Sequence, residues 1–234
     1  AIKKDWSSKK PFRYCYLDNF LHVEKAEELL ANYPDTYKGE WNNTTYIHQK
    51  NKFQKTKFEP GDCFDQAFQE LNCPEFLSLM SEITGIGNLL PDAELLGGGL
   101  HQSINGAYLD VHIDFNFHPK TKNHRRLNIL VYMNKDWKDD YTAGHLELWD
   151  MTDNGHKKRM ERIAPIFNRM AMFETNQISY HGHPHPLKTP EGVSRRSMAV
   201  YYYTKTRPQH EIADEHSTVY VNTTGVNGKI KNLF

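Results

Sequence analysis

The sequence offers the ligands of a metal site: two histidines and an aspartate. His112 and Asp114 are separated by one residue in the alternating segment YLDVHIDFNF, and residues two apart on a strand point to the same face. The segment SYHGHPH supplies a third ligand, for which we predict His181. His183 and His185 each precede a proline, which disfavours regular strand geometry.

Two imidazoles and one carboxylate suit Fe(II), because they leave coordination positions open for an oxidisable co-substrate and dioxygen. A structural zinc site would need cysteines or a further histidine, and a hydrolytic zinc enzyme would need a nearby glutamate base. Neither pattern is evident, so zinc is the second candidate. The alternative for an isolated His-x-Asp pair is two polar residues on a solvent-facing strand.

A second pattern is typical of carboxylate binding. Arg195 and Ser197 are two residues apart in RRSMAVYYYT, fourteen residues after His181. A guanidinium with a hydroxyl on the same strand face makes a strong cradle for a carboxylate. A solvated surface cation is the alternative for Arg195 alone, but its position after His181 favours binding of a dicarboxylate whose other end reaches the iron.

Taken together, these motifs resemble a known family. They are His112-x-Asp114, His181, Arg195-x-Ser197 and the closing YYYT. The combination resembles the Fe(II)/2-oxoglutarate-dependent oxygenase superfamily, specifically its prolyl-4-hydroxylase-like branch, over nearly half of the chain. The resemblance implies a double-stranded β-helix, with Fe(II) held by the two histidines and the aspartate, and with 2-oxoglutarate and O2 as co-substrates.

The resemblance also implies which residues bind 2-oxoglutarate. Arg195 would pair with its distal carboxylate, Ser197 would help, and Tyr132 would hydrogen-bond the same end. Gln102 is a further candidate, because it stands ten residues before the His-x-Asp motif, where prolyl hydroxylases tend to place a tyrosine near the co-substrate.

The implied reaction is hydroxylation of an unactivated C–H bond with release of succinate and CO2. The presence of Asp114 favours oxygen transfer, since related halogenases replace this carboxylate by a small residue. Desaturation and ring closure stay open. We expect a small-molecule substrate, such as an amino acid or another metabolite. The alternatives are a peptidyl, prolyl-type hydroxylase acting on a protein and a non-enzymatic jelly-roll module that binds metal.

Candidate substrate contacts are scattered along the chain. Four carry the prediction: Trp41, Asn116, Arg126 and His145. Arg126 could hold a carboxylate or phosphate. The family's common Gly-Gly-x-Leu resembles Ala143-Gly144-His145-Leu146 here, so His145 could face the substrate or solvent. Weaker candidates are Asn42, Asn43, His118 and Arg125.

The elements that must position these residues change character along the chain. Residues 11–34 predict a strand and a helix, residues 38–60 a long loop or flap, and residues 62–84 two helices broken at Pro74. Short runs of β-formers follow Gly85. We therefore predict a mainly β fold with flanking helices, a jelly roll of the cupin-like kind. A single domain, residues 1–234, would comprise an N-terminal part (1–90), the jelly-roll core (91–204) and a C-terminal extension (205–234).

Composition limits the partners and the setting. Lys and Arg number 29, as do Asp and Glu, so no basic excess exists to bind a nucleic-acid polymer or an anionic membrane. No apolar run approaches the ~20 residues that span a bilayer, and the segment AIKKDWSSKKPFRY lacks the apolar stretch of a secretory signal. Three cysteines without a CxxC pair argue against a disulfide framework. We expect a cytoplasmic protein.

Overall fold

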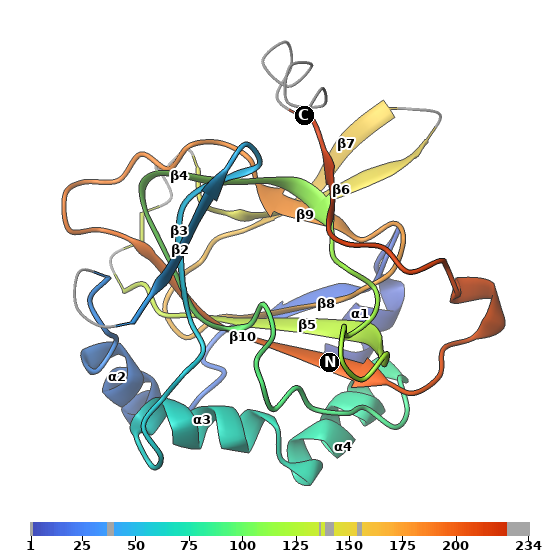
Figure 1. Ribbon diagram of the computed structural model, residues 1–234, viewed down its shortest axis with the longest axis horizontal. Coiled ribbons are helices and arrows are strands. Elements are labelled where there is room, and N and C mark those ends of the chain that lie inside the picture. Colours follow the sequence, from blue (N-terminus) through green and yellow to red (C-terminus); the bar gives the residue numbers. More distant parts are fainter. Residues whose placement is uncertain (1, 37–39, 136, 139–142, 154–155, 224–234) are drawn as a thin grey trace.

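The strands of the described residues form one continuous, 11-stranded antiparallel sheet that curls into two facing parts, named here the first and the second sheet. Helices cover the outer side of the first sheet (Figure 1). The computed structural model describes residues 2–36, 40–135, 137–138, 143–153 and 156–223. The first sheet runs in the order β1 (Tyr14–Leu17), β8 (Met170–Glu174), β5 (His124–Tyr132), β10 (Arg195–Thr204), β4 (Gly99–Ile113), β3 (Gln49–Lys55) and β2 (Asn42–Tyr46). The second contains β4 again, then β9 (Tyr180–His183), β6 (Leu146–Asp153) and β7 (His156–Ile163).

The long strand β4 belongs to both sheets. Its first residues, 99–103, pair with residues 195–199 of β10, and Ser103 lies opposite Arg195. Its last residues pair with β9, where His112 lies opposite His181. The C-terminal segment, red in Figure 1, returns as β11 (Val219–Val221) and pairs with the end of β4. Strand β4 thus connects the two sheets along one side of the space between them. The fold is a double-stranded β-helix, the predicted jelly roll.

Helices form where the sequence provides caps and an apolar face. The helices are α1 (Ile2–Ser8), α2 (Val23–Ala31), α3 (Cys63–Leu71), α4 (Pro74–Thr84) and the short 3-10 helix η1 (Gln209–Glu211). The side chain of Asp62 accepts hydrogen bonds from the first amides of α3, and Pro74 occupies the first turn of α4, where a missing N–H costs nothing. None of the helices in the described part of the chain is long and apolar enough to cross a membrane.

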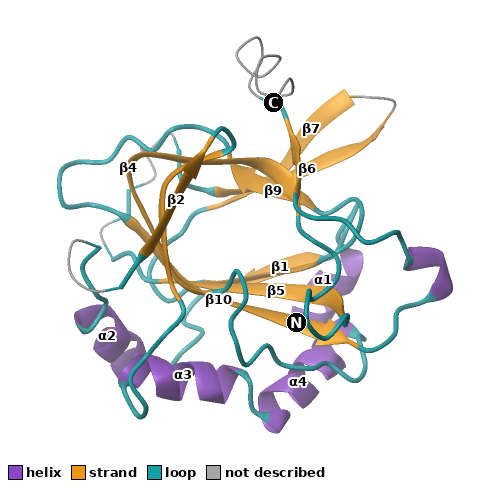
Figure 2. Ribbon diagram, in the orientation of Figure 1, coloured by secondary structure: helices purple, strands orange, loops and turns teal. Residues whose placement is uncertain are grey.

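The main core lies between these helices and the first sheet. Phe64, Phe68 and Leu71 of α3 are buried in the same cluster as Val131 of β5 and Met198 of β10. Figure 2 shows α2, α3 and α4 lined up along the outer face of this sheet. Burial of their apolar faces leaves the inner face of the sheet for the site.

Most predicted elements are present, with one clear difference. The strand and helix of residues 11–34, the helix pair broken at Pro74 and the run of strands after Gly85 are confirmed. Residues 38–60 are not one long loop, because β2 and β3 form a hairpin there and β3 pairs with β4. The hairpin residues are mostly exposed or half-buried, so they show no apolar alternation that would have revealed strands.

Candidate active site

Three side chains converge between the sheets at one end of β4. His112 lies on β4, Asp114 follows that strand, and His181 lies on β9 directly opposite His112. Their ligand atoms all lie within 4.8 Å of one another. His112 Nε2 is 3.6 Å from Asp114 Oδ1, and His181 Nε2 is 3.5 Å from Asp114 Oδ2. Each residue exposes less than a tenth of its surface, so the donors face one small, dry volume.

Hydrogen bonds fix which imidazole nitrogen faces that volume. His112 Nδ1 lies 2.8 Å from the carbonyl oxygen of Asp110, and His181 Nδ1 lies 2.9 Å from that of Ser179. A carbonyl can only accept, so each Nδ1 carries a proton and each ring turns Nε2, the atom free to bind a metal, inward. Burial lowers the pKa of His181 to about 3, which keeps this ring neutral.

Arg125 and Asn128 hold the carboxylate of Asp114. Arg125 forms an ion pair of 3.0 Å with Asp114 Oδ2, and Asn128 Nδ2 donates to the same oxygen at 2.7 Å. Arg125 also lies over the rings of Phe115 and Tyr201, 4.6 and 3.7 Å from their centroids. Burial alone would raise the pKa of Asp114, but the charge of Arg125 outweighs it and holds the pKa well below its usual value.

Arg195 and Ser197 lie on the neighbouring strand β10 and line the same cavity. Arg195 Nε donates to the carbonyl oxygen of Gly144 at 2.7 Å, and a terminal nitrogen donates to the hydroxyl of Tyr132 at 3.2 Å. The hydroxyl of Ser197 is buried without a hydrogen-bond partner among the described residues. A buried polar atom left unpaired is costly, so this hydroxyl suits a bound ligand.

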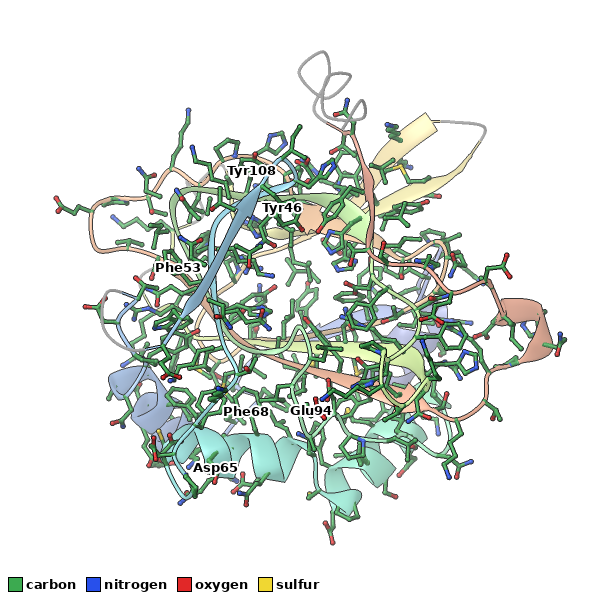
Figure 3. All side chains as sticks on the ribbon, in the orientation of Figure 1. Tyr46, Phe53, Asp65, Phe68, Glu94 and Tyr108 are labelled. Carbon is green, nitrogen blue, oxygen red and sulfur yellow. The ribbon has the colours of Figure 1, made fainter. Side chains whose placement is uncertain are left out.

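The cavity has a volume of about 270 Å³ and is closed partly by the β2–β3 hairpin. Figure 3 shows side chains from both sheets filling the space around it, with Tyr46 on the hairpin side. Tyr220 of β11 bonds through its hydroxyl to that of Tyr46 and stacks on His48, with ring centroids 4.4 Å apart. Its ring also lies 5.3 Å from that of His112, so the C-terminal strand helps to wall the site.

Gln102 does not reach this cavity. It pairs with Arg196 of β10 and therefore points to the other face of the sheet. Its amide nitrogen donates to Ser194 at 2.8 Å, and the residue lines a separate cavity. The adjacent His101 faces the site instead, because neighbouring residues of a strand point to opposite faces.

The structure also places the four predicted substrate contacts outside the cavity. Trp41 stacks on Tyr33 of the helical layer. Asn116 Nδ2 donates to the carbonyl oxygen of Asp214. Arg126 contacts Thr204 and Glu211, and His145 contacts Arg162.

The other four candidates differ in their positions relative to the cavity. Asn42 and Asn43 are exposed on β2, and His118 bonds the backbone of its own turn. Only Arg125 reaches the cavity.

Several lining residues were not foreseen from the sequence. Lys52 of β3, Asn128 of β5 and Tyr220 of β11 all line the cavity. Lys52 lay within the segment expected to be a loop. Asn128 belongs to RLNILVYMN, the segment expected as a strand, and it shares a face with Tyr132 because they are four residues apart.

The site fits Fe(II) and 2-oxoglutarate by the chemistry of its donors. Two inward-facing imidazole nitrogens and a carboxylate kept ionised form a set of N and O ligands that iron accepts. Arg195 and the unpaired hydroxyl of Ser197 lie in the same cavity and offer cationic and neutral donors for a carboxylate.

Comparison with known proteins agrees with this geometry. Residues 98–203 match the sequence model of the 2OG-Fe(II) oxygenase superfamily. No curated protein matches the chain in sequence.

Solved structures share its fold at low identity. A prolyl-4-hydroxylase from Pseudomonas putida is similar with a TM-score of 0.58 and 15% identity, over 87% of this chain and 98% of that one. A Trichoplax adhaerens prolyl hydroxylase, in complex with a peptide fragment of the hypoxia inducible factor oxygen degradation domain, has a TM-score of 0.58 and 16% identity, over 87% and 88%. The non-heme alpha ketoglutarate dependent epimerase SnoN from nogalamycin biosynthesis has a TM-score of 0.57 and 12% identity, over 95% and 96%.

The superfamily match spans β4 to β10 and thus includes the three converging metal-ligand candidates and Arg195. Through residues 98–203, the chain belongs to the 2OG-Fe(II) oxygenase superfamily and is a dioxygenase that uses Fe(II), 2-oxoglutarate and O2.

Proposed function

We propose that the enzyme hydroxylates an unactivated C–H bond of a small molecule, such as an amino acid or another metabolite, with release of succinate and CO2. The observation that carries this proposal is the partly enclosed cavity of about 270 Å³ in which His112, Asp114 and His181 converge beside Arg195. Ligand sites commonly measure ~300–1,000 Å³. Once 2-oxoglutarate is bound, the remaining space suits a small substrate.

Each residue has a defined task in this reaction. Bound Fe(II) supplies the activation of O2 that oxidation of a C–H bond requires. His112, Asp114 and His181 hold the ion through their inward-facing atoms, and the outward hydrogen bonds of the two rings keep them in the required tautomer. Arg125 and Asn128 orient the Asp114 carboxylate.

The co-substrate is bound by β10. Arg195 anchors the distal carboxylate of 2-oxoglutarate, and Ser197 donates its otherwise unpaired hydroxyl to the same group. Tyr132 fixes the guanidinium. The cavity is partly desolvated, so this charge pair is stronger than it would be in bulk water. The hairpin and Tyr220 exclude water from the reacting end.

Peptidyl hydroxylation is the second candidate. It is supported by the similarity in fold to prolyl hydroxylases, one of them bound to a peptide fragment. The small volume and the partial cover by the β2–β3 hairpin favour a free molecule. The non-enzymatic alternative is no longer supported, because the chain belongs to an oxygenase superfamily.

Succinate formation tests the proposal. The purified enzyme with Fe(II), 2-oxoglutarate and O2 should release succinate, and free small molecules should stimulate the release more than peptides do. Asp114→Ala should lose both iron and succinate formation, because one of the three ligands is removed. Glu82→Ala, on the exposed face of α4, is the matched control. Stimulation by peptides alone would favour the second candidate, and full activity of Asp114→Ala would refute the metal site.

A further inference from the structure

Lys52 is a cation on the wall of the cavity that forms no ion pair at contact distance with any described residue. It lies on β3 and lines the cavity together with Arg125 and Arg195. Arg125 is paired with Asp114, and Arg195 is held by Gly144 and Tyr132. For the ammonium of Lys52, no described side chain supplies an ion pair or a hydrogen bond.

The strand register separates Lys52 from the proposed anchor of 2-oxoglutarate. Lys52 and Arg195 pair with the same residue, Ser103 of β4, from its two sides. Two strand spacings of ~4.8 Å therefore lie between their backbones. The guanidinium of Arg195 also extends away from β3, towards Tyr132 of β5. The two cations thus serve opposite sides of the cavity.

The described surroundings of Lys52 contain no anionic group close enough to form an ion pair with it. Burial is the main cause that lowers the pKa of Lys52 to about 8. The positive charge of Arg195 acts in the same direction, and the negative charge of Asp114 opposes them only in part. Lys52 is half-buried, and a charge withdrawn from solvent without a partner is costly. Asp114 is the one carboxylate among the described residues that line the cavity, and Arg125 already faces it. An anionic ligand would offset this cost.

2-Oxoglutarate does not supply that anion. One of its carboxylates is assigned to Arg195 and the other to the metal, so the charge on Lys52 stays unpaired after the co-substrate binds. Thr44 is the cross-strand neighbour of Lys52 and also lines the cavity. Its hydroxyl can join the ammonium in binding an oxyanion, as Ser197 can join Arg195.

We propose that Lys52 binds a carboxylate of the primary substrate, so that the enzyme oxidises a small acidic molecule. The proposal rests on the function proposed above and names its substrate class. A carboxylate matches the single charge of Lys52, whereas a phosphate monoester would bring a second charge that no described lining residue balances. Selectivity for an acid thus comes from the β2–β3 hairpin rather than from Arg126, which lies outside the cavity.

The test uses a simple carboxylate as the probe. The full-length protein is loaded with Mn(II) and saturating 2-oxoglutarate, and the 19F relaxation of 3-fluoropropionate is compared with that of 3-fluoropropionamide. Paramagnetic Mn(II) relaxes a fluorine that binds beside it. Since a charge-assisted hydrogen bond should strengthen binding about tenfold or more, the acid should show the larger enhancement.

Variants of two lysines on one strand make the result specific. Lys52→Met should abolish the difference between acid and amide, and Lys52→Arg should keep it. Lys50→Met is the matched control, because Lys50 is exposed on the same strand and does not line the cavity. It should behave as the wild type does. The affinity for 2-oxoglutarate, measured by titration, should be unchanged in Lys52→Met.

Three results would overturn the proposal. They are equal enhancement for acid and amide in the wild type, an undiminished difference in Lys52→Met, and a weakened affinity of Lys52→Met for 2-oxoglutarate at unchanged probe binding. The last would assign Lys52 to the co-substrate. A wild type that retains no Mn(II) by metal analysis would instead contradict the proposed function, and this readout is independent of the probe.

Discussion

Arg125 is the side chain that connects the metal-ligand candidates with the rest of the cavity wall. It pairs with Asp114, donates to Asn128, and lies over the rings of Phe115 and Tyr201. A guanidinium keeps its charge at any ordinary pH and loses little by lying against aromatic faces. Arg125 therefore keeps the carboxylate ionised and oriented even though both groups are buried.

Replacing Arg125 should weaken metal binding. In Arg125→Met, Asp114 loses the ion pair that lowers its pKa, so its carboxylate is less well ordered and holds a proton more tightly. Partners of this kind change metal affinity roughly 10- to 100-fold, and we expect a loss in that range in an Mn(II) titration. Arg126→Met is the control, because Arg126 contacts Thr204 and Glu211 outside the cavity. Unchanged affinity in Arg125→Met would contradict the role.

At the residue scale, the sequence predicts the metal-ligand candidates better than it predicts the other residues that line the cavity. The spacing of His112 and Asp114 sets their common face locally, and their convergence with His181 follows from a strand pairing that the family resemblance implies. Lys52 reaches the cavity only because β3 pairs with β4 across some fifty residues. That register leaves no local pattern in the sequence. Gln102 illustrates the same limit of sequence-based prediction, because a shift of one residue along β4 moves a side chain to the other face of the sheet.

At the scale of elements, the contact between β3 and β4 depends on a glycine. Gly99 has φ +83°, and a Cβ on it would lie 2.3 Å from the carbonyl oxygen of Lys55. The two strands approach closely there because the side chain is absent. This contact fixes the end of β3 and, three residues earlier, the position of Lys52.

Gly99→Ala should therefore destabilise the fold. Alanine is strained at positive φ, and the new Cβ would push β3 away, so we expect a loss of more than ~1 kcal/mol in the free energy of unfolding, measured in urea. Gly87→Ala serves as the comparison, because a Cβ there meets nothing within 4 Å. Equal stability of the two variants would argue against the close contact.

A second element-level prediction concerns the end of β8. Burial raises the pKa of Glu174, whose carboxylate accepts a hydrogen bond from the amide of Arg13 at 2.7 Å. The folded state then holds the proton more tightly than the unfolded state, so stability falls as the pH rises above the usual value of 4.5. Glu174→Gln cannot ionise and can still accept this bond. Its stability relative to the wild type should be higher at pH 8 than at pH 5 in urea unfolding, and the reverse order would refute the assignment.

At the scale of the whole molecule, three distant parts of the chain meet at Tyr220. The β2–β3 hairpin contributes Tyr46 and His48, β4 contributes His112, and the C-terminal segment contributes the tyrosine itself. The helices hold the opposite sheet (Figure 1) and take no part in this contact. The hairpin is thus held to the barrel partly through the C-terminal strand.

Removing the Tyr220 ring should loosen the hairpin. In Tyr220→Ala, the stack on His48 and the bond to Tyr46 are both lost, so amide hydrogen exchange in residues 42–55 should become faster. Tyr220→Phe keeps the stack and should show a smaller change. Tyr16→Ala, at an exposed position of β1, controls for the loss of a tyrosine. Exchange that is unchanged in Tyr220→Ala would show that the hairpin is anchored elsewhere.

The overall architecture follows from sequence patterns where packing is local. Alternating β-formers and capped amphipathic helices mark the two sheets and their covering layer, as in α3 and β5. The hairpin of residues 42–55 was missed because its strands are polar on both faces: one side meets solvent, and the other faces a cavity for polar ligands. Strand β7, with the sequence HKKRMERI, was missed because most of its described side chains are exposed at the edge of the sheet.

The position of the β2–β3 hairpin bears on how enzymes with this fold can come to accept different substrates. The hairpin of residues 42–55 forms part of the cavity wall, yet His112, Asp114, His181 and Arg195 all lie outside it. Exchange of this short stretch between relatives would retune which molecule is accepted while the oxidising machinery stayed intact. With Lys52 in its proposed role, selectivity and redox chemistry would be carried by separate parts of one barrel.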